Sequence, residues 1–144
     1  MKIFFNKKRL IKEIQNTKDL GFVPTMGSIH KGHLSLIKKS KKLSSKTIVS
    51  IFVNKPQFNN KNDFKKYPRS IKKDINLLKK SKINYLYLPS AKEIYPHGRN
   101  KNIRISKWKR ILCGKNRKGH FEAVVDVVDR FIKIIKPSQI YLGE

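Results

Sequence analysis

The segment TIVSIFVN, residues 47–54, restricts the fold of this chain more than any other stretch. It is rich in β-branched residues and almost wholly apolar, so a strand formed by it must be covered on both faces. Strands of this kind lie inside parallel sheets that carry helices on both sides. The rest of the sequence is therefore expected to supply those helices and the neighbouring strands.

Helices and strands are predicted to alternate along the chain. Apolar residues at helical spacing predict helices over 6–16, from His33 onward, from Ser70 onward and over 120–135. Extended apolar runs predict further strands around 22–23, over 83–90 and at 140–143, with 56–69 and 91–118 mostly in loops. Since strand and helix alternate, a parallel sheet with helices on both faces is expected. We predict one α/β domain over residues 1–144.

The helix predicted over 120–135 has a broad apolar face. Its three acidic residues, Glu122, Asp126 and Asp129, are four and three positions apart and are expected to lie opposite that face.

The chain is strongly basic, with 35 Lys and Arg against 9 Asp and Glu and a formal charge of +26. Such a charge attracts polyanions in general, including nucleic acids, so non-specific polyanion binding is expected. Lys outnumbers Arg 28 to 7 and is scattered in pairs. Planar recognition of phosphates and bases favours Arg, so the lysines fit a solvated surface better than a dedicated RNA interface.

A single cysteine, Cys113, excludes an internal disulfide and favours a reducing compartment. No run reaches the roughly 18 apolar residues of a membrane span, and Ile3-Phe4-Phe5 is too short for a signal-peptide core. We expect a cytoplasmic protein without a membrane partner.

Two of the four histidines lie in the segment VPTMGSIHKGHLSLI, residues 23–37. His30 and His33 stand between a turn and a predicted helix, and Gly27 and Gly32 are expected to let the backbone turn tightly and approach a ligand. A helix N-terminus attracts phosphate, and histidine there adds a directional donor that titrates near pH 7. The pair therefore fits stabilisation of charge on a phosphoryl group. Histidines in a purely structural role fit the bare pattern too, whereas a metal site lacks neighbouring Cys or carboxylate ligands.

Asn54 and Gln57 follow the strand 47–54 just as the histidines follow the strand before it. The carboxyl ends of parallel strands share one edge of a sheet, so both groups are expected at that edge. Turn-forming residues beside Pro56 are the alternative interpretation of Asn54 and Gln57.

Five segments carry a family resemblance: VPTMGSIHKGH, SIFVNKPQF, DFKKYPRS, NRKGHFEAVVDVV and YLGE. In this order and spacing, from about residue 20 to 144, they resemble pantothenate synthetases (pantoate–β-alanine ligases), which are nucleotidyltransferases with an H-x-G-H motif. The resemblance implies a Rossmann-like fold and a two-step reaction in coenzyme A biosynthesis. ATP and pantoate form pantoyl adenylate and pyrophosphate, and the amine of β-alanine then displaces AMP. Mg²⁺ would bridge phosphate oxygens. The resemblance also implies a homodimer formed through this domain.

The resemblance also assigns roles to particular residues. The ATP site would be lined by Met26, Gly27, Ser28, Ile29, His30, Lys31, Gly32 and His33, with Gly143 and Glu144 beside the adenosine. His30 and His33 would be the catalytic pair that holds the phosphates, and His33 is the usual proton donor of the family. Pantoate and β-alanine would be bound by Gln57, Asn54 and Tyr67, and Arg117 and His120 would contact phosphates. A surface position for Arg117 and a loop-covering role for Tyr67 fit those two residues nearly as well.

The chain departs from the family pattern in several places, and two of them bear on function. Lys55 replaces a usual proline and Pro56 follows one position later, which is expected to affect the loop that carries Gln57. The family also continues after Gly-Glu into a lid domain, so this chain is expected to be the N-terminal domain, and its activity alone stays open. An inactive fragment, a basic RNA-binding protein on the same fold and another nucleotidyltransferase are the alternative functions.

Overall fold

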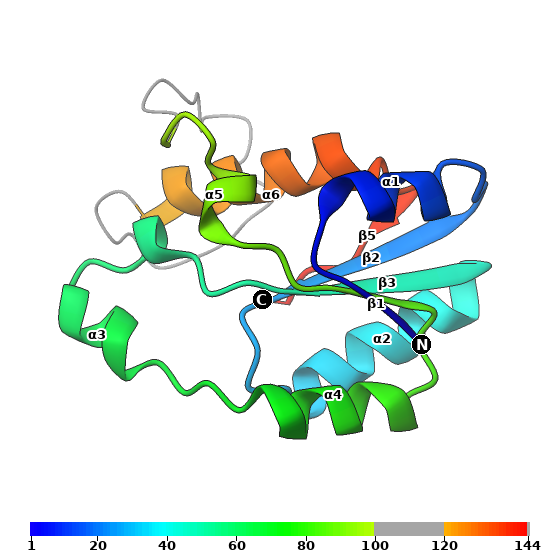
Figure 1. Ribbon diagram of the computed structural model, residues 1–144. Coiled ribbons are helices and arrows are strands. Elements are labelled where there is room, and N and C mark those ends of the chain that lie inside the picture. The colour runs from blue at the N-terminus through cyan, green and yellow to red at the C-terminus, as the bar shows by residue number, and fades with distance from the viewer. Residues whose placement is uncertain (100–119, 144) are drawn as a thin grey trace.

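Five strands form one sheet in the order β1-β4-β3-β2-β5, and every pairing between neighbours is parallel. The computed structural model describes residues 1–99 and 120–143 (Figure 1). The strands are β1 (Lys2–Phe4), β2 (Leu20–Thr25), β3 (Lys46–Ile51), β4 (Tyr85–Tyr87) and β5 (Gln139–Ile140). The predicted α/β class with a parallel sheet is therefore confirmed.

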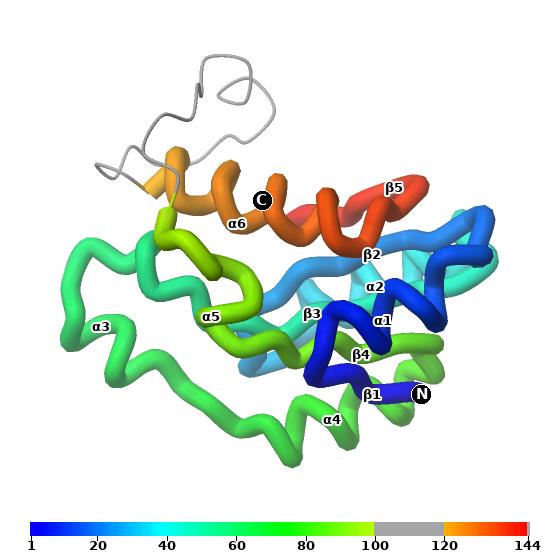
Figure 2. Tube along the Cα trace, turned by 45° about the horizontal axis from the view of Figure 1, so that its top comes forward, coloured from blue at the N-terminus to red at the C-terminus, as the bar shows by residue number. Residues whose placement is uncertain are grey.

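Helices cover both faces of this sheet. They are α1 (Lys7–Ile14), α2 (Lys31–Leu43), α3 (Lys61–Lys66), α4 (Ile71–Lys80), α5 (Ala91–Ile94) and α6 (His120–Ile135), with a 3-10 turn η1 (Lys55–Gln57). Figures 1 and 2 show α1, α5 and α6 on one side of the sheet and α2 and α4 on the other. The layers therefore follow the alternation of strand and helix in the sequence.

The central strand β3 separates two hydrophobic cores. Ile48 packs in the core beneath α1 and α6, whereas Val49, the next residue, packs in the core beneath α2 and α4. Neither side chain is exposed to solvent. Successive strand residues point to opposite faces, which explains why this segment has to be apolar throughout.

Some elements differ from the prediction. The short strand β1 was not expected, because three residues carry too little pattern; it forms by pairing with β4, which lies more than 80 positions away in the sequence. Residues 56–69 contain part of η1 and all of α3 rather than only loop, and Asn60 caps α3 by accepting a hydrogen bond from the Asn62 amide. The strands within 83–90 and 140–143 are shorter than expected, and the last one starts at Gln139.

The expectation for the acidic residues of α6 is wrong for Asp126. Its side chain is buried, with 3% of the residue exposed, on the side of the helix that packs against the rest of the fold. Arg130 lies one helical turn further on, and its Nε is 2.7 Å from Asp126 Oδ1. This ion pair lets a carboxylate occupy a buried position that the apolar pattern alone excludes.

Candidate functional site

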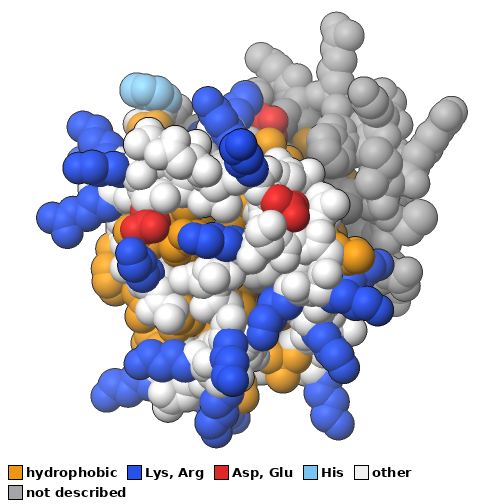
Figure 3. All heavy atoms as spheres, turned by 90° about the vertical axis from the view of Figure 1, so that its right-hand side faces the viewer, with side chains coloured by type: hydrophobic (Ala, Val, Ile, Leu, Met, Phe, Trp, Pro, Cys, Tyr) orange, Lys and Arg blue, Asp and Glu red, His pale blue; other side chains and the backbone are white. Residues whose placement is uncertain are grey.

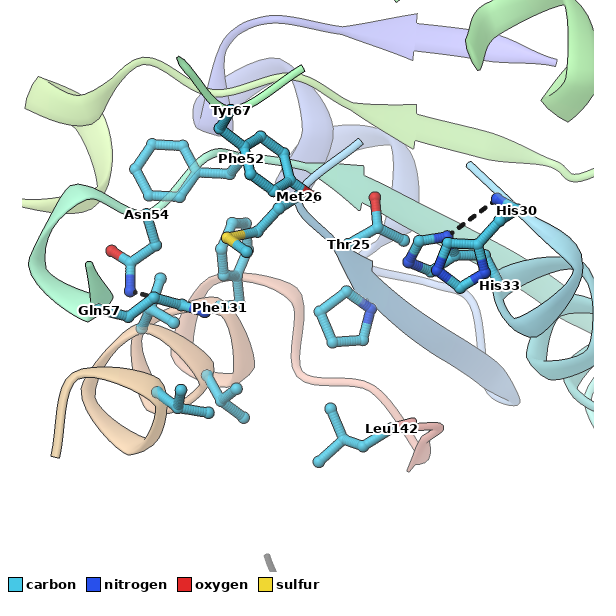
Figure 4. Close-up of a pocket in the computed structure, with 14 residues that line it drawn as sticks. Thr25, Met26, His30, His33, Phe52, Asn54, Gln57, Tyr67, Phe131 and Leu142 are labelled. Carbon is cyan, nitrogen blue, oxygen red and sulfur yellow. Dashed lines mark hydrogen bonds between the residues drawn. The ribbon is translucent and has the colours of Figure 1, made fainter. Parts of the chain in front are cut away.

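A cavity of about 240 Å³ opens at the carboxyl ends of β2 and β3 (Figure 4). One wall is apolar and includes Phe52, Val124, Val127, Val128, Phe131 and Leu142. The polar lining residues include His30 and His33 on one side and Asn54, Gln57 and Tyr67 on the other, together with Thr25 at the end of β2. The structure thus brings together the two groups of residues that sequence reasoning placed at one edge of the sheet.

His30 and His33 cap the first turn of α2 with their own side chains. The Gly32 amide donates to His30 Nδ1 at 3.0 Å, and the His30 amide donates to His33 Nδ1 at 3.2 Å. This reciprocal arrangement is a capping box in which both capping groups are imidazoles. Helix α2 consequently begins at Lys31, two residues earlier than predicted. The amides of His30 and Gly32, which would otherwise be available to a phosphate, are occupied by the two rings.

The capping box fixes the tautomer of both rings. A nitrogen that accepts a hydrogen bond carries no proton, so each neutral imidazole has its proton on Nε2. Nε2 lies across the ring from Nδ1 and therefore points away from the helix turn. Burial, followed by the charge of the neighbouring His30, lowers the pKa of His33 below its ordinary value, and Asp74 opposes this shift. His33 is accordingly a neutral hydrogen-bond donor at pH 7.

Gly32 does not form a tight turn. Its lack of a side chain instead leaves room for the His30 ring. This glycine lies inside α2, and a Cβ atom there would be 2.8 Å from His30 Cε1 and 3.0 Å from His30 Nδ1. The expectation of a tight turn holds only for Gly27, whose φ is +81°.

The backbone between Gly27 and His30 is held by Asp74, a residue that sequence reasoning missed. Ser28 has a left-handed φ of 51°, and the amides of Ser28 and Ile29 each donate to one carboxylate oxygen of Asp74 at 2.9 Å. Asp74 lies on α4 and is 2% exposed. A buried carboxylate with two amide donors is a strong anchor. The sequence offered one signal that could have found Asp74, because an acidic residue stands there among the apolar positions of the predicted helix.

The other residues expected to line the ATP site take different positions. Met26 lines the cavity, whereas Lys31 is exposed at the start of α2 and Ile29 is buried in the core beneath α2 and α4. The amides of Ser28 and Ile29 are already bound to Asp74, and Ser28 Oγ donates to the Pro68 carbonyl at 3.1 Å. That bond joins residues 24–33, the histidine loop, to the segment that carries Tyr67.

Asn54 and Gln57 form a hydrogen-bonded pair on the opposite side of the cavity. Asn54 is 1% exposed, and its Nδ2 donates to Gln57 Oε1 at 3.1 Å and to the Ala123 carbonyl at 3.4 Å. Residues 54–57, the glutamine segment, end in η1, which accommodates Lys55 and Pro56 while Gln57 still reaches the cavity.

Among the remaining predicted residues that the structure describes, Tyr67 lines the cavity and His120 and Gly143 do not. Burial raises the pKa of the Tyr67 hydroxyl. His120 starts α6, and its Nδ1 is 3.1 Å from the Gln57 carbonyl, so this ring supports the glutamine segment. Gly143 is exposed beside the lining residue Leu142. Arg117 and Glu144 lie outside the described residues.

The described residues contain no group of three His, Cys, Asp or Glu side chains that could hold a metal ion. Asp74, the carboxylate nearest the histidine loop, is committed to two backbone amides.

Among the helices of the described chain, none is long and apolar enough to cross a membrane. Figure 3 shows Lys and Arg side chains spread over one face of the molecule, with few acidic side chains between them.

A family model, pantoate-beta-alanine ligase, matches residues 3–144. The pantothenate synthetase of Pseudothermotoga lettingae is 42% identical over 137 residues, which cover 95% of this chain and 49% of that protein. The enzyme of Francisella tularensis subsp. novicida is 45% identical over 139 residues, covering 96% and 52%. The chain spans about half the length of the curated relatives that it matches.

Solved structures give the same result. The pantothenate synthetase of Thermus thermophilus superposes with a TM-score of 0.88 at 32% identity, covering all of this chain and 52% of that one. The pantoate–β-alanine ligase of Francisella tularensis, solved in complex with beta-gamma ATP and β-alanine, has a TM-score of 0.88 at 43% identity, covering all of this chain and 57% of that one.

Proposed function

The chain belongs to the pantoate–β-alanine ligase family, and on that premise we propose that it binds ATP and pantoate and activates pantoate as an adenylate. The observation that carries this proposal is the cavity itself. Two histidine donors face it from one side and a glutamine amide from the other. Such a site suits the joining of a phosphate-bearing substrate to an oxygen-rich acid.

In the first step, a carboxylate oxygen of pantoate would attack the α-phosphorus of ATP, and the bond to pyrophosphate would break. Negative charge builds up on phosphate oxygens during this displacement. His30 and His33 would donate their Nε2 protons in hydrogen bonds to those oxygens. We propose hydrogen bonding rather than proton transfer, because a second proton on Nδ1 would break the capping box.

The acid would be held between Gln57, Tyr67 and the apolar wall. Pantoate carries a dimethyl-substituted carbon next to its hydroxyl-bearing carbons, so it needs apolar and polar contacts side by side. Phe52, Val128 and Phe131 would cover the methyl groups. A site built to pair substrate hydroxyls rejects analogues that lack them.

In the second step, the amine of β-alanine would attack the acyl carbon of pantoyl adenylate, and AMP would leave with the electron pair of the broken bond. Support comes from the Francisella tularensis relative, whose solved complex contains β-alanine. The described residues provide no carboxylate set for Mg²⁺, so we propose that the ion enters as part of the MgATP substrate.

Further properties are proposed on the family premise and on charge. We propose a cytoplasmic homodimer. The +26 charge would add weak binding of polyanions without sequence preference. An RNA-binding role would instead require sequence preference together with a steep dependence on salt.

Pantoate-dependent ATP–pyrophosphate exchange tests the proposed activation step. The 144-residue chain is expected to exchange label only when pantoate is present, and His33→Ala is expected to abolish most of that exchange. His97→Ala is the control, because His97 is exposed and does not line the cavity. Absence of exchange from a folded wild-type chain would contradict the proposal for this chain and favour an inactive fragment.

A further inference from the structure

The glutamine amide that faces the cavity is connected to a cluster on α5 and α6 that has no part in the proposed reaction. Tyr95, directly after α5, donates its hydroxyl proton to Asn54 Oδ1 at 2.6 Å. Asn54 in turn donates to Gln57 Oε1 at 3.1 Å. A continuous chain of hydrogen bonds therefore leads from Tyr95 to Gln57, and its first link spans 41 positions of sequence.

The orientation of each amide in this chain is determined by its partners. The Ala123 carbonyl can only accept, so Asn54 must turn Nδ2 towards it and Oδ1 towards Tyr95. Gln57 must then turn Oε1 towards Asn54. Its Nε2 group is left with two protons, and within the described part of the chain nothing accepts them. The end of Gln57 that faces the cavity is consequently a donor.

Tyr95 is itself held as a donor by its surroundings. The Arg130 guanidinium lies 4.4 Å from the centre of the Tyr95 ring, and it donates to the carbonyls of Ile94 and Gly98 at 2.9 Å. These contacts fix the backbone on both sides of Tyr95. Burial, followed by the charge of Asp126, raises the pKa of Tyr95 to about 12, so the hydroxyl keeps its proton.

We propose that Tyr95 is a positioning residue that directs the Nε2 donors of Gln57 into the cavity, so that this side of the site takes an acceptor oxygen of the acid substrate. The inference rests on the proposed function and adds to it the polarity of substrate recognition. The substrate oxygen is a carboxylate or hydroxyl oxygen, either of which accepts from an amide. The proposal would be overturned if the cluster had a purely structural role and only joined α5 to α6.

The test compares two variants that remove the same atom. Tyr95→Phe removes the donor to Asn54, whereas Tyr85→Phe removes a hydroxyl whose contacts are Glu13 and Lys46, outside the cavity. Each variant, and wild type, is titrated with pantoate while the side-chain amide signals of Asn54 and Gln57 are followed by ¹⁵N NMR. Thermal unfolding of all three proteins shows how much stability each substitution costs.

We expect Tyr95→Phe to weaken pantoate binding about tenfold, the factor that corresponds to one neutral hydrogen bond, and Tyr85→Phe to leave it within about twofold. The Gln57 amide signal should shift or broaden in Tyr95→Phe alone. Equal affinities of Tyr95→Phe and wild type would overturn the proposal, as would equal losses in the two variants. If wild type does not bind pantoate, the proposed function fails. The Gln57 amide signal then tests the positioning role by itself. An unchanged signal in Tyr95→Phe overturns that role, and a changed signal retains it.

Discussion

The histidine loop and the glutamine segment face the same cavity but are held by different kinds of contact. His30 and His33 are fixed by backbone amides no more than three positions away. Asn54 and Gln57 are fixed by Tyr95, Ala123 and His120, at separations of 41, 69 and 63 positions. The two histidine rings are thus oriented by neighbours in the sequence, although Asp74 of α4 anchors the backbone before them. The orientation of the glutamine segment depends instead on the packing of α5 and α6.

This difference has consequences for how each side responds to change. Substitutions in the histidine loop should alter helix capping and donor geometry together, because the same rings perform both roles. Substitutions around the glutamine segment should alter substrate recognition through partners that never touch the substrate. The following predictions separate the two.

The largest effect is expected at His33. Replacing it by Ala should lower pantoate-dependent exchange on the order of a hundredfold or more, since a donor to the developing phosphate charge is lost. Replacing it by Gln should also lower exchange strongly, because the Gln amide donor does not occupy the position of the ring Nε2. Gln is a normal third residue of a capping box, so His33→Gln should retain helix stability, whereas His33→Ala should lose about 1 kcal/mol. Exchange and urea unfolding measure the two effects. Equal exchange in His33→Gln and wild type would show that the ring serves only as a cap.

The next largest effect is expected at Asp74. Asp74→Asn should cost about 2–3 kcal/mol in the free energy of unfolding, because one backbone amide of the histidine loop would meet an NH₂ group instead of a carboxylate oxygen. Nucleotide binding should weaken as well, because the loop loses its anchor. Asp63→Asn is the matched control, since Asp63 is exposed on α3. Similar unfolding curves for the two variants would contradict the anchoring role.

A smaller and unusual effect is expected at Gly32. Gly to Ala inside a helix ordinarily stabilises by about 1 kcal/mol. Here the new Cβ displaces the His30 ring from its cap, which costs a similar amount. Gly32→Ala should therefore leave stability nearly unchanged while it weakens ATP binding, as isothermal titration would show. A clear gain in stability with normal ATP affinity would mean that the ring position is unimportant.

The smallest effect concerns pH. The pKa of His33 is lowered in the folded state, so below about pH 6.5 the unfolded chain binds a proton before the folded chain does. Wild type should lose stability relative to His33→Gln as the pH falls from about 6.5 through the folded pKa, and the difference should then stay constant. Denaturant unfolding from about pH 8 to about pH 5 tests this. A difference between the two proteins that does not vary with pH would refute the lowered pKa.

The sequence was sufficient to predict the parallel sheet, both covering layers and the meeting of His30 and His33 with Asn54 and Gln57. Each of these features follows from periodicity within a single segment and from the geometry of parallel strands. The family resemblance was likewise confirmed by the match over residues 3–144.

The contacts that hold the site could not be predicted, for a common physical reason. Asp74 looks like an ordinary acid in an amphipathic helix, and its role appears only when Ser28 and Ile29 fold against it. Tyr95 lies in a stretch that was expected to be mostly loop. Asp126 has the sequence pattern of an exposed acid, yet it is buried and paired with Arg130. Asp74 and Tyr95 each depend on a partner that the fold, and not the local pattern, brings close, whereas the i,i+4 spacing of Asp126 and Arg130 is visible in the sequence.

The most direct test of the central claim is the protonation state of the two histidine rings. ¹⁵N chemical shifts of the ring nitrogens of His30 and His33, measured on the folded chain at neutral pH, report which nitrogen carries the proton. Each ring should carry its proton on Nε2 and have a hydrogen-bonded, unprotonated Nδ1. A proton on Nδ1 of either ring, or a doubly protonated ring, would contradict the claim that helix capping turns these histidines into fixed donors.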